Sequence, residues 1–391
     1  MVSDGFRATE IGPLGRQLPT GVPRGATVNG ATTDVQFDDG TFTFVNEWLR
    51  DNCACTRCRI TQTDERRVTP WTVPSTDSPI ATVDDAGLHL TWSDGHRSLF
   101  TAGTFTAIQR ASSRGRYTAN LWQRGYQLDR FHHDAAVNDL ATRRQLFEAF
   151  RRDGAIVVTD SPTVPGTCMD LVRSLGLTLR DSSLGLIFNV KLDPAGFNVA
   201  YTSESIPPHH DNAQYTQPPT GQVLAMLVND ATGGESIVVD SWSLVDNLRR
   251  TDPAAVDVLS RVPVGFRQYS EQAEGFTRAP LIILDREGRC SHLRFSNQLM
   301  QPLPFDEPEL AEWYRAYRVL GAAICDPTNH VTFRLRAGDM LFVNSLRVLH
   351  ARTEFVPDGP RHLQDIYFDV DDVFGNLDRL TGLALNEMVT S

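Results

Sequence analysis

The sequence lacks any apolar run that approaches the roughly 20 residues a membrane-spanning helix needs. It has no long basic run, and its net charge of −11 argues against nucleic acid as the main partner. The first six residues show no basic segment followed by an apolar one, so no secretory signal is expected. Cysteine is sparse, with six in 391 residues, which excludes a disulfide framework. These shortages predict a cytoplasmic protein that binds neither membrane nor nucleic acid.

The residues that are present suffice for a substantial core. Hydrophobic residues make up 41% of the chain and charged residues 22%, as in ordinary globular proteins. A length of 391 residues predicts one very large domain or two ordinary ones. No internal repeat or low-complexity run is visible. We expect an N-terminal domain over 1–115 and a second domain over 116–391.

Three of the six cysteines lie within six positions: Cys53, Cys55 and Cys58. Thiolates at this spacing can bind one face of a tetrahedral zinc ion, which normally takes four protein ligands. His96, after the turn signal Asp94-Gly95, is the preferred fourth ligand, and His89, inside a strand predicted over 88–92, competes with it. Four protein ligands leave no open position, so the zinc is expected to be structural. Free buried thiols are the alternative.

The N-terminal domain is expected to be rich in β-structure. Apolar and polar residues alternate over 35–44 around Asp38-Asp39-Gly40, which predicts a β-hairpin. Residues 60–86 are rich in Thr, Pro, Asp and Ser and are expected to form loop. Residues 99–125 are expected to be irregular, with Leu121-Trp122 as an apolar contact.

The second domain begins with helical patterns and then turns to β patterns. Helices are predicted over 144–150, ending at Gly154, over 169–175, ending at Gly176, and from Pro253 and Pro308 onward. Strands are predicted over 155–158, 197–201, 223–228, 236–240, 281–284, 340–343 and 365–370. Trp313, Tyr314 and Tyr317 share one face of the last helix, which predicts a core contact or a homodimer interface. Many short strands with inserted helices favour a mainly β jelly-roll sandwich (α+β) over an alternating βαβ sheet.

The segment Pro208-His209-His210-Asp211 predicts part of a metal site. Side chains at i and i+2 of a strand share a face, so His209 and Asp211 can converge on one ion while His210 points away. An imidazole and a carboxylate suit Fe(II), and a second histidine completes a two-His-one-carboxylate triad with open positions for co-substrate and oxygen. His350, just after the strand predicted over 340–343, is the best candidate. A polar strand end and a structural histidine are the alternatives.

Arg361 stands eleven positions after His350 (361 minus 350) and opens a strand on which Tyr367 shares its face. A guanidinium binds a carboxylate bidentately, as a dicarboxylate co-substrate would need. Ser236 could add its hydroxyl to the same carboxylate. A surface salt bridge is the alternative for Arg361 and the preferred interpretation of Arg352.

Together these motifs resemble the Fe(II)- and 2-oxoglutarate-dependent dioxygenases of the gamma-butyrobetaine/trimethyllysine hydroxylase group, within the wider taurine-dioxygenase-like family. The resemblance covers both domains. In the first it rests on Trp48-Leu49-Arg50-Asp51-Asn52-Cys53-x-Cys55-x2-Cys58 and Trp92-x-Asp94-Gly95-His96. In the second it rests on Asn198-Val199-Ala200-Tyr201, His209-x-Asp211, Thr232-Gly233-Gly234, Arg347-x2-His350 and Arg361-His362-Leu363.

The resemblance implies a double-stranded β-helix in the second domain and a small zinc-binding domain before it. It implies Fe(II) held by His209, Asp211 and His350, and 2-oxoglutarate held by Arg361 with help from Ser236. The implied reaction consumes O2, releases succinate and CO2, and hydroxylates an unactivated C–H bond of a small amine, betaine or amino-acid-like substrate. Desaturation or cyclisation by the same oxidant is an alternative outcome.

The expected substrate pocket departs from the family pattern. Betaine hydroxylases enclose a trimethylammonium with aromatic faces, and Tyr201 and Tyr367 match two such positions, with Asn198 in the same motif. The other two positions fall on Leu184 and Phe188, where a tyrosine and a tryptophan would be expected. Losing these rings could remove roughly 1–2 kcal/mol of cation stabilisation, so the expected substrate is not gamma-butyrobetaine itself.

Two functions of other classes compete with the dioxygenase. A catalytically inactive zinc-module binding protein would have lost at least one member of the triad or Arg361, yet all are present. A zinc hydrolase would use His209, His210 and Asp211, but adjacent histidines on a strand point to opposite faces.

Overall fold

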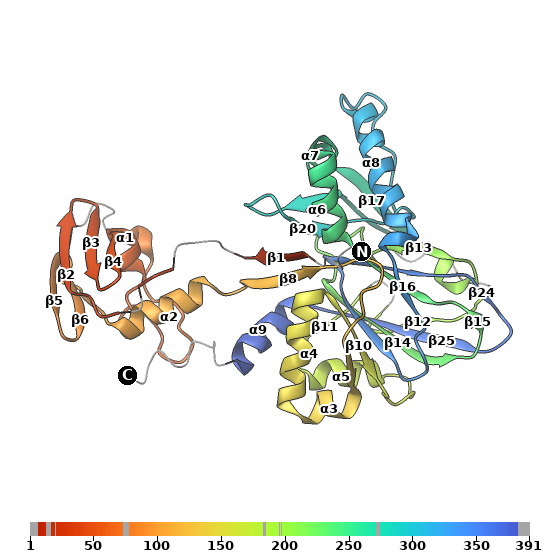
Figure 1. Cartoon of the computed structure of the whole chain (residues 1–391), viewed down its shortest axis with the longest axis horizontal. Helices are drawn as coiled ribbons and strands as arrows, with labels where there is room; N and C mark the ends of the chain where they lie inside the picture. Colours follow the sequence, from red (N-terminus) through yellow and green to blue (C-terminus); the bar gives the residue numbers. More distant parts are fainter. Residues whose placement is uncertain are drawn as a thin grey trace, which may run out of the picture. The chain divides into compact units, whose positions relative to one another are not determined.

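The computed structural model describes residues 7–12, 17–19, 21–72, 78–182, 185–194, 196, 198–270 and 274–381. Ile11–Arg116 makes up most of one compact unit, and Tyr117–Leu377 makes up most of the other. Figure 1 shows both units and labels many of their helices and strands. Among the helices in these ranges, none combines the length and apolar character that crossing a membrane requires.

Two three-stranded antiparallel sheets build the N-terminal unit. One consists of β2 (Gly25–Asn29), β3 (Thr32–Phe37) and β4 (Gly40–Val45), and the other of β5 (Ile80–Asp84), β6 (Gly87–Thr91) and β7 (Arg97–Phe100). The helices are α1 (Asn46–Asp51), η1 (Pro70–Thr72) and α2 (Ala102–Ser112). The predicted hairpin is confirmed, because β3 and β4 pair up to the turn, where Phe37 faces Gly40. Both sheets contribute to one apolar core, with Val35 and Phe42 from the first and Leu88 and Phe100 from the second.

Two larger sheets build the second unit (Figure 1). The large sheet has the order β11-β25-β14-β22-β10-β9, with β12 also paired to β25. Its strands are β9 (Arg130–His132), β10 (Ala155–Thr159), β11 (Leu179–Arg180), β12 (Phe188–Val190), β14 (Gly221–Asn229), β22 (Met340–Asn344) and β25 (Arg361–Phe368). The small sheet has the order β13-β23-β16-β21, formed by β13 (Ile206–His209), β16 (Ser236–Asp240), β21 (Val331–Phe333) and β23 (Val348–Arg352). Among the described strands of these two sheets, β9 and β10 pair in parallel, and all other neighbours pair antiparallel.

Shorter ladders and helices surround these sheets. The ladders are β1 (Arg7–Ile11) with β8 (Tyr117–Leu121), β15 (Thr232–Gly233) with β24 (Phe355–Val356), β17 (Val264–Tyr269) with β18 (Glu274–Ala279), and β19 (Ile282–Leu284) with β20 (Cys290–Leu293). The helices are α3 (His133–Asn138), α4 (Leu140–Asp153), α5 (Thr167–Ser174), η2 (Val199–Tyr201), α6 (Ser241–Thr251), α7 (Pro253–Arg261), α8 (Leu310–Cys325), η3 (Pro327–Asn329) and α9 (Val370–Leu380).

The large and small sheets share one apolar core. Val157 and Leu341 of the large sheet and Val238 and Val348 of the small sheet are all fully buried in it. α4 and α5 contact the large sheet, whereas α6, α7 and α8 pack against one another (Figure 1). The predicted class, mainly β with inserted helices, is confirmed.

Most predicted elements of the second domain are confirmed. α4 ends at Gly154, whose φ of +75° is the left-handed conformation that favours glycine at a helix end. β16 has the predicted bounds, and Pro253 occupies the first turn of α7. β25 begins at Arg361, where a strand was expected to open, and so starts four residues before the run predicted over 365–370 (365 minus 361).

Three predicted assignments are wrong. Residues 60–86 are not all loop, because β5 pairs with β6. Residues 99–125 are not irregular, because they contain α2 and β8; α2 begins with a capping box between Thr101 and Thr104 and buries only Phe105, so no apolar stripe signals it. The strand predicted over 197–201 is a 3-10 helix in its described part, η2.

A buried ion pair fixes the start of the strand that carries His350. The side chains of Arg347 and Asp240 are fully enclosed, with 2.7 Å between Nη2 and Oδ2. Arg347 also donates to the carbonyl of Arg152, and Oδ1 of Asp240 accepts from the backbone N–H of Trp242 at the start of α6. A buried charge that loses its partner stays desolvated and unpaired, so removing either member of this pair should strongly destabilise the fold.

Replacing Asp240 by alanine should therefore lower the free energy of unfolding by about 3–5 kcal/mol, because Arg347 is left as an unpaired buried cation. Urea denaturation followed by circular dichroism measures the change. Asp257→Ala is the matched control, since its pair with Arg261 is exposed and solvent screening leaves it little effect on stability. Equal losses in the two variants would contradict the central role of the buried pair.

Candidate active site and metal centres

The three predicted triad residues come together from two paired strands. His209 ends β13, and His350 lies directly opposite it in β23. Asp211 follows two residues later, and Asn212 then takes a left-handed φ of 58°, which asparagine tolerates and which turns the chain. One potential ligand atom from each of the three residues lies within 4.8 Å of the others.

The distances in this cluster fit a single metal ion. Nε2 of His209 lies 3.3 Å from Oδ1 of Asp211, and Nε2 of His350 lies 3.7 Å from Oδ2. Neighbouring ligands of an octahedral ion with bonds of about 2.1 Å are roughly 3 Å apart, so a small adjustment brings all three within bonding distance. Two imidazoles and one carboxylate are the ligand set of non-haem Fe(II) sites.

The charges in the cluster favour binding of a divalent cation. Burial acts to raise the pKa of Asp211, but His350 and His209 outweigh it and hold that pKa well below its usual range. Burial and then repulsion from His209 lower the pKa of His350 to about 4. An ionised carboxylate beside a neutral imidazole is the protonation state in which both bind a metal.

His210 points away from the triad, as predicted. Its Nδ1 lies 3.2 Å from the backbone of Phe295, and its ring packs edge-on against His292. Burial lowers the pKa of His210 to about 4. The zinc hydrolase alternative needs His209 and His210 on one ion, and this arrangement argues against it.

A cavity of about 180 Å³ adjoins the triad and contains most of the predicted site residues. Ser236, Arg361, Phe188, Asn198 and Tyr367 line it together with the triad. Tyr201 is not among its lining residues in the described chain; its ring packs edge-on against Phe188, with centroids 5.5 Å apart. Leu184 lies outside the described residues.

Arg361 is a buried cation without an acidic partner in the part of the chain that the structure describes. Its Nε has no hydrogen-bond partner, and its guanidinium stacks on Phe355 at 5.2 Å from the ring centroid. Gly234, with φ +70°, makes room for it, because a Cβ there would lie 3.3 Å from Nε of Arg361. Burial and then the charge of Arg334 lower the pKa of Arg361 to about 10, so it stays cationic at neutral pH. Such a group is ready to bind a ligand carboxylate.

Arg352 is not the surface residue that the sequence suggested. It is buried, and its Nη2 donates to the carbonyls of Thr202 and Glu204 at 2.8 and 2.6 Å. It also stacks on the ring of Phe355. Arg352 therefore ties the chain before β13 to β23, through distant backbone acceptors that no sequence pattern marks.

Sequence reasoning missed two polar residues behind the triad, Gln222 and Asp365. Asp365 shares a face of β25 with Arg361 and Tyr367, so strand alternation could have found it. Gln222 lies on β14 and meets Tyr367 only through the ladder. Burial and then the charge of Asp211 raise the pKa of Asp365 well above its usual range.

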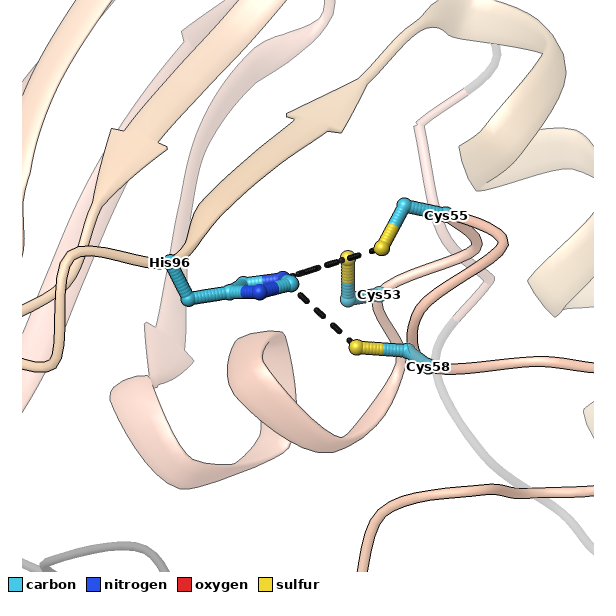
Figure 2. Close-up of side chains that lie close together, drawn as sticks. All are labelled: Cys53, Cys55, Cys58 and His96. Atoms are coloured by element: carbon cyan, nitrogen blue, oxygen red, sulfur yellow. Dashed lines mark hydrogen bonds between the residues drawn. The ribbon is translucent and has the colours of Figure 1, made fainter.

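The predicted zinc ligands converge in the N-terminal unit (Figure 2). Nε2 of His96 lies 3.4, 3.8 and 3.5 Å from the sulfurs of Cys53, Cys55 and Cys58, respectively. A tetrahedron with metal bonds of about 2.0–2.3 Å has edges of about 3.5 Å, so the cluster is compatible with zinc. His89 is elsewhere, with Nε2 2.8 Å from Oδ1 of Asp84.

Arg50 supports this cluster. Its Nη1 lies 3.4 Å from the sulfur of Cys58, and its Nη2 lies 3.2 Å from Oδ2 of Asp94. Oδ1 of Asp94 in turn accepts from the backbone N–H of His96. Burial raises the pKa of Cys58 to about 12, and the hydrogen bond from Arg50 opposes this by favouring the thiolate, which is the form that binds a metal.

Comparison with known proteins decides the family. The sequence model of "Taurine catabolism dioxygenase TauD, TfdA family" matches residues 103–367. The chain belongs to this family. A second model, "Gamma-butyrobetaine hydroxylase-like, N-terminal", matches residues 26–105, which include all four residues of the Cys3His cluster.

Relatives of this TauD, TfdA family member span both units. The chain is 33% identical over 344 residues to the gamma-butyrobetaine dioxygenase of Pseudomonas sp. (strain AK-1), with 85% of this chain and 89% of the relative covered. It is 24% identical over 379 residues to the trimethyllysine dioxygenase of Meyerozyma guilliermondii, with 90% and 94% covered. A solved asparagine oxygenase with Fe(II), 2S,3S-3-hydroxyasparagine and succinate has 24% identity and a TM-score of 0.47, covering 61% of this chain and 83% of its own.

Family membership confirms the predicted enzyme class. This TauD, TfdA family member is a 2-oxoglutarate-dependent dioxygenase, and Fe(II) and 2-oxoglutarate are its cofactor and co-substrate. O2 and a small molecule are its other substrates. The inactive binding protein is therefore not favoured.

His350→Ala should abolish 2-oxoglutarate turnover, because it removes one of three converging ligand atoms. His210→Ala should retain most of the turnover, since that ring faces Phe295 and not the triad. Succinate release by the iron-loaded protein measures both, after circular dichroism has shown that each variant is folded. The reverse pattern would favour the hydrolase alternative.

Proposed function

We propose that this dioxygenase hydroxylates an unactivated C–H bond of a small amine, betaine or amino-acid-like molecule other than gamma-butyrobetaine. In this proposal His209, Asp211 and His350 hold Fe(II), while Arg361 and Ser236 hold 2-oxoglutarate. One observation carries the assignment: the three-ligand cluster and a buried guanidinium without an acidic partner line the same cavity. When bound, Fe(II) and the keto acid supply the O2-dependent oxidation, with succinate and CO2 as co-products.

The chain itself positions the diacid and excludes water. The fork of Arg361 suits one carboxylate of a dicarboxylate. Ser236 faces Arg352 across the β16–β23 ladder, and its hydroxyl lies in the same cavity wall as Arg361. Apolar side chains complete the wall: Val190, Ile206, Leu224 and Leu363. A dry wall protects the protein from the oxidant and directs it to the substrate.

The remaining wall supports a small polar substrate. Beyond the triad and the arginines, its polar lining consists largely of neutral side chains: Asn198, Asn212, Gln268, Ser296 and Gln298. Amides donate and accept hydrogen bonds, so they suit a molecule that carries both an amine and a carboxylate. Phe188 and Tyr367 are the aromatic rings in this wall, and two rings are a weaker surface for an ammonium than the full aromatic enclosure of a betaine hydroxylase.

The proposal also covers the type of β-fold, the domain boundaries, the cellular location and the oligomeric state. The core shared by the two sheets supports a double-stranded β-helix. We propose a zinc domain over 1–115 and an oxygenase domain over 116–391; the compact units divide the chain at nearly the same place but group residues 7–10 with the second unit and 378–381 with the N-terminal unit. A cytoplasmic location and the absence of nucleic-acid and membrane partners stay predictions from composition. A homodimer through α8 also stays a prediction; Trp313 is buried within the chain itself, so Tyr314 would be the aromatic available for it.

We propose further that Cys53, Cys55, Cys58 and His96 hold a structural zinc ion. Four protein ligands leave no position for a substrate, and Arg50 offsets part of the thiolate charge. The ion would join α1 and the chain after it to the turn between β6 and β7, so it would stabilise the N-terminal unit.

His96→Ala should lower the zinc content from about one ion per chain towards zero and reduce the thermal stability, because structural zinc contributes folding free energy directly. Inductively coupled plasma mass spectrometry and thermal unfolding measure the two effects. His89→Ala is the matched control and should retain zinc, since that ring binds Asp84. Zinc lost from the control and kept in His96→Ala would reverse the assignment.

A turnover screen tests the substrate proposal. The iron-loaded protein is incubated with 2-oxoglutarate, O2 and a panel of quaternary amines and amino acids, and succinate release and product mass are measured. We expect one or more small zwitterions to stimulate succinate release and gain one oxygen atom. Tight coupling to gamma-butyrobetaine, the substrate named in the 33% identical relative, would refute its exclusion.

Replacing Arg361 by methionine tests the proposed 2-oxoglutarate site in the same succinate assay. Arg361→Met should raise KM for 2-oxoglutarate about 10- to 100-fold, because a hydrogen bond to a charged group contributes about 1.5–3 kcal/mol.

A further inference from the structure

The carboxylate of Asp211 is held from behind by two hydrogen-bond donors. Nε2 of Gln222 lies 2.7 Å from its Oδ2, and the hydroxyl of Tyr367 lies 3.0 Å from the same oxygen. The same two side chains also reach Asp365, with Nε2 of Gln222 2.9 Å from Oδ1 and the hydroxyl of Tyr367 2.8 Å from Oδ2. A hydroxyl has one hydrogen, so when Tyr367 donates to Asp211 it accepts from a protonated Asp365. The four side chains therefore form a closed ring of hydrogen bonds, the carboxylate ring.

Two neighbouring strands of the large sheet build this carboxylate ring. Gln222 on β14 and Tyr367 on β25 are direct partners across the ladder, and Asp365 lies two residues before Tyr367 on the same face. All three side chains are almost completely buried. Their places are thus fixed by the backbone of the sheet, which is more rigid than a loop.

Burying the carboxylate ring lowers the stability of the fold, which argues against a purely structural role. Two buried carboxyl groups that share donors repel each other when both are charged, and each has lost its water. Apolar residues of similar volume at 222 and 365 would fill the same space without this cost. Buried polar groups of this kind concentrate where a site must be held in one geometry.

The hydrogen bonds distinguish the two oxygens of Asp211. Both donors end on Oδ2. Oδ1 is the oxygen that faces His209, at 3.3 Å from Nε2. Oδ2 lies 3.7 Å from Nε2 of His350, so both oxygens border the triad, but the two donors from the sheet engage Oδ2 alone. A carboxylate held in this way cannot turn freely, and Oδ1 is its less engaged oxygen.

We propose that Gln222, Tyr367 and Asp365 are positioning residues that hold Asp211 by Oδ2 and reserve Oδ1 for the metal. A carboxylate that bound through both oxygens would occupy an additional position that the keto acid or O2 needs. This inference rests on the proposed Fe(II) site. In this inference the hydroxyl of Tyr367 orients Asp211, while its ring lines the cavity wall.

Tyr367→Phe tests the inference, because it removes the hydroxyl and keeps the ring. The affinity for Mn(II), a redox-stable substitute for Fe(II), should fall about 10-fold or more, as is typical for lost partners of metal ligands. Gln222→Leu should lower it in the same direction, since it removes the other donor to Oδ2. Mn(II) titration followed by electron paramagnetic resonance gives the affinities, and urea unfolding of the metal-free proteins gives their stabilities.

Tyr269→Phe is the matched control, because this exposed tyrosine lies on β17 and its loss of a hydroxyl should leave Mn(II) affinity unchanged. Unchanged affinity in both Tyr367→Phe and Gln222→Leu, with lower stability alone, would overturn the inference and leave the carboxylate ring a structural feature. If one variant does not fold, the other decides. If the unaltered protein does not bind Mn(II), or His350→Ala binds it equally well, the proposed Fe(II) site itself fails, which is a distinct result.

Discussion

The active site depends on the pairing of β13 with β23. This ladder places His209 directly opposite His350, although 141 residues separate them in the chain (350 minus 209). Asp211 then needs only the turn after His209 to complete the cluster. The neighbouring β16–β23 ladder brings Ser236 opposite Arg352, so one strand connects the metal site with the cavity wall that holds Arg361. A shift of one residue in β23 would turn His350 to the other face.

The interior around this ladder contains several buried polar groups, and two of its arginines contrast. Arg347 with Asp240 is a complete pair that protein groups satisfy, and it anchors the start of β23. Arg361 is incomplete, because the described chain offers it no acidic partner. An unpaired buried charge lowers the stability of the fold. A ligand of opposite charge would explain why Arg361 is buried without a partner. Under the proposed function, the same contrast separates a pair that holds the fold from a cation that binds the co-substrate.

Short-range patterns were sufficient for much of the fold and site. Strand alternation predicted that His209 and Asp211 converge while His210 points away, and they do so although β13 ends at His209 and Asp211 lies beyond it. The spacing of the cysteines located the Cys3His cluster. Sequence patterns failed where an element has few apolar residues or where a side chain binds residues far away in the chain. α2 has a polar sequence with a single buried side chain, so no apolar stripe marks it. Arg352 binds backbone carbonyls, which every residue possesses and no sequence motif reveals.

From the sequence came the enzyme class, through the family resemblance, and the candidate metal ligands, because ligand chemistry depends on residue types and, for His209 with Asp211, on short spacing. The tertiary structure alone decided which distant groups meet. It brought Gln222 beside Tyr367 and Asp365, and it moved Tyr201 against Phe188, out of the lining of the cavity. The physical reason is register: which residues face each other across a ladder is settled by the packing of whole sheets, and a local pattern does not contain that information.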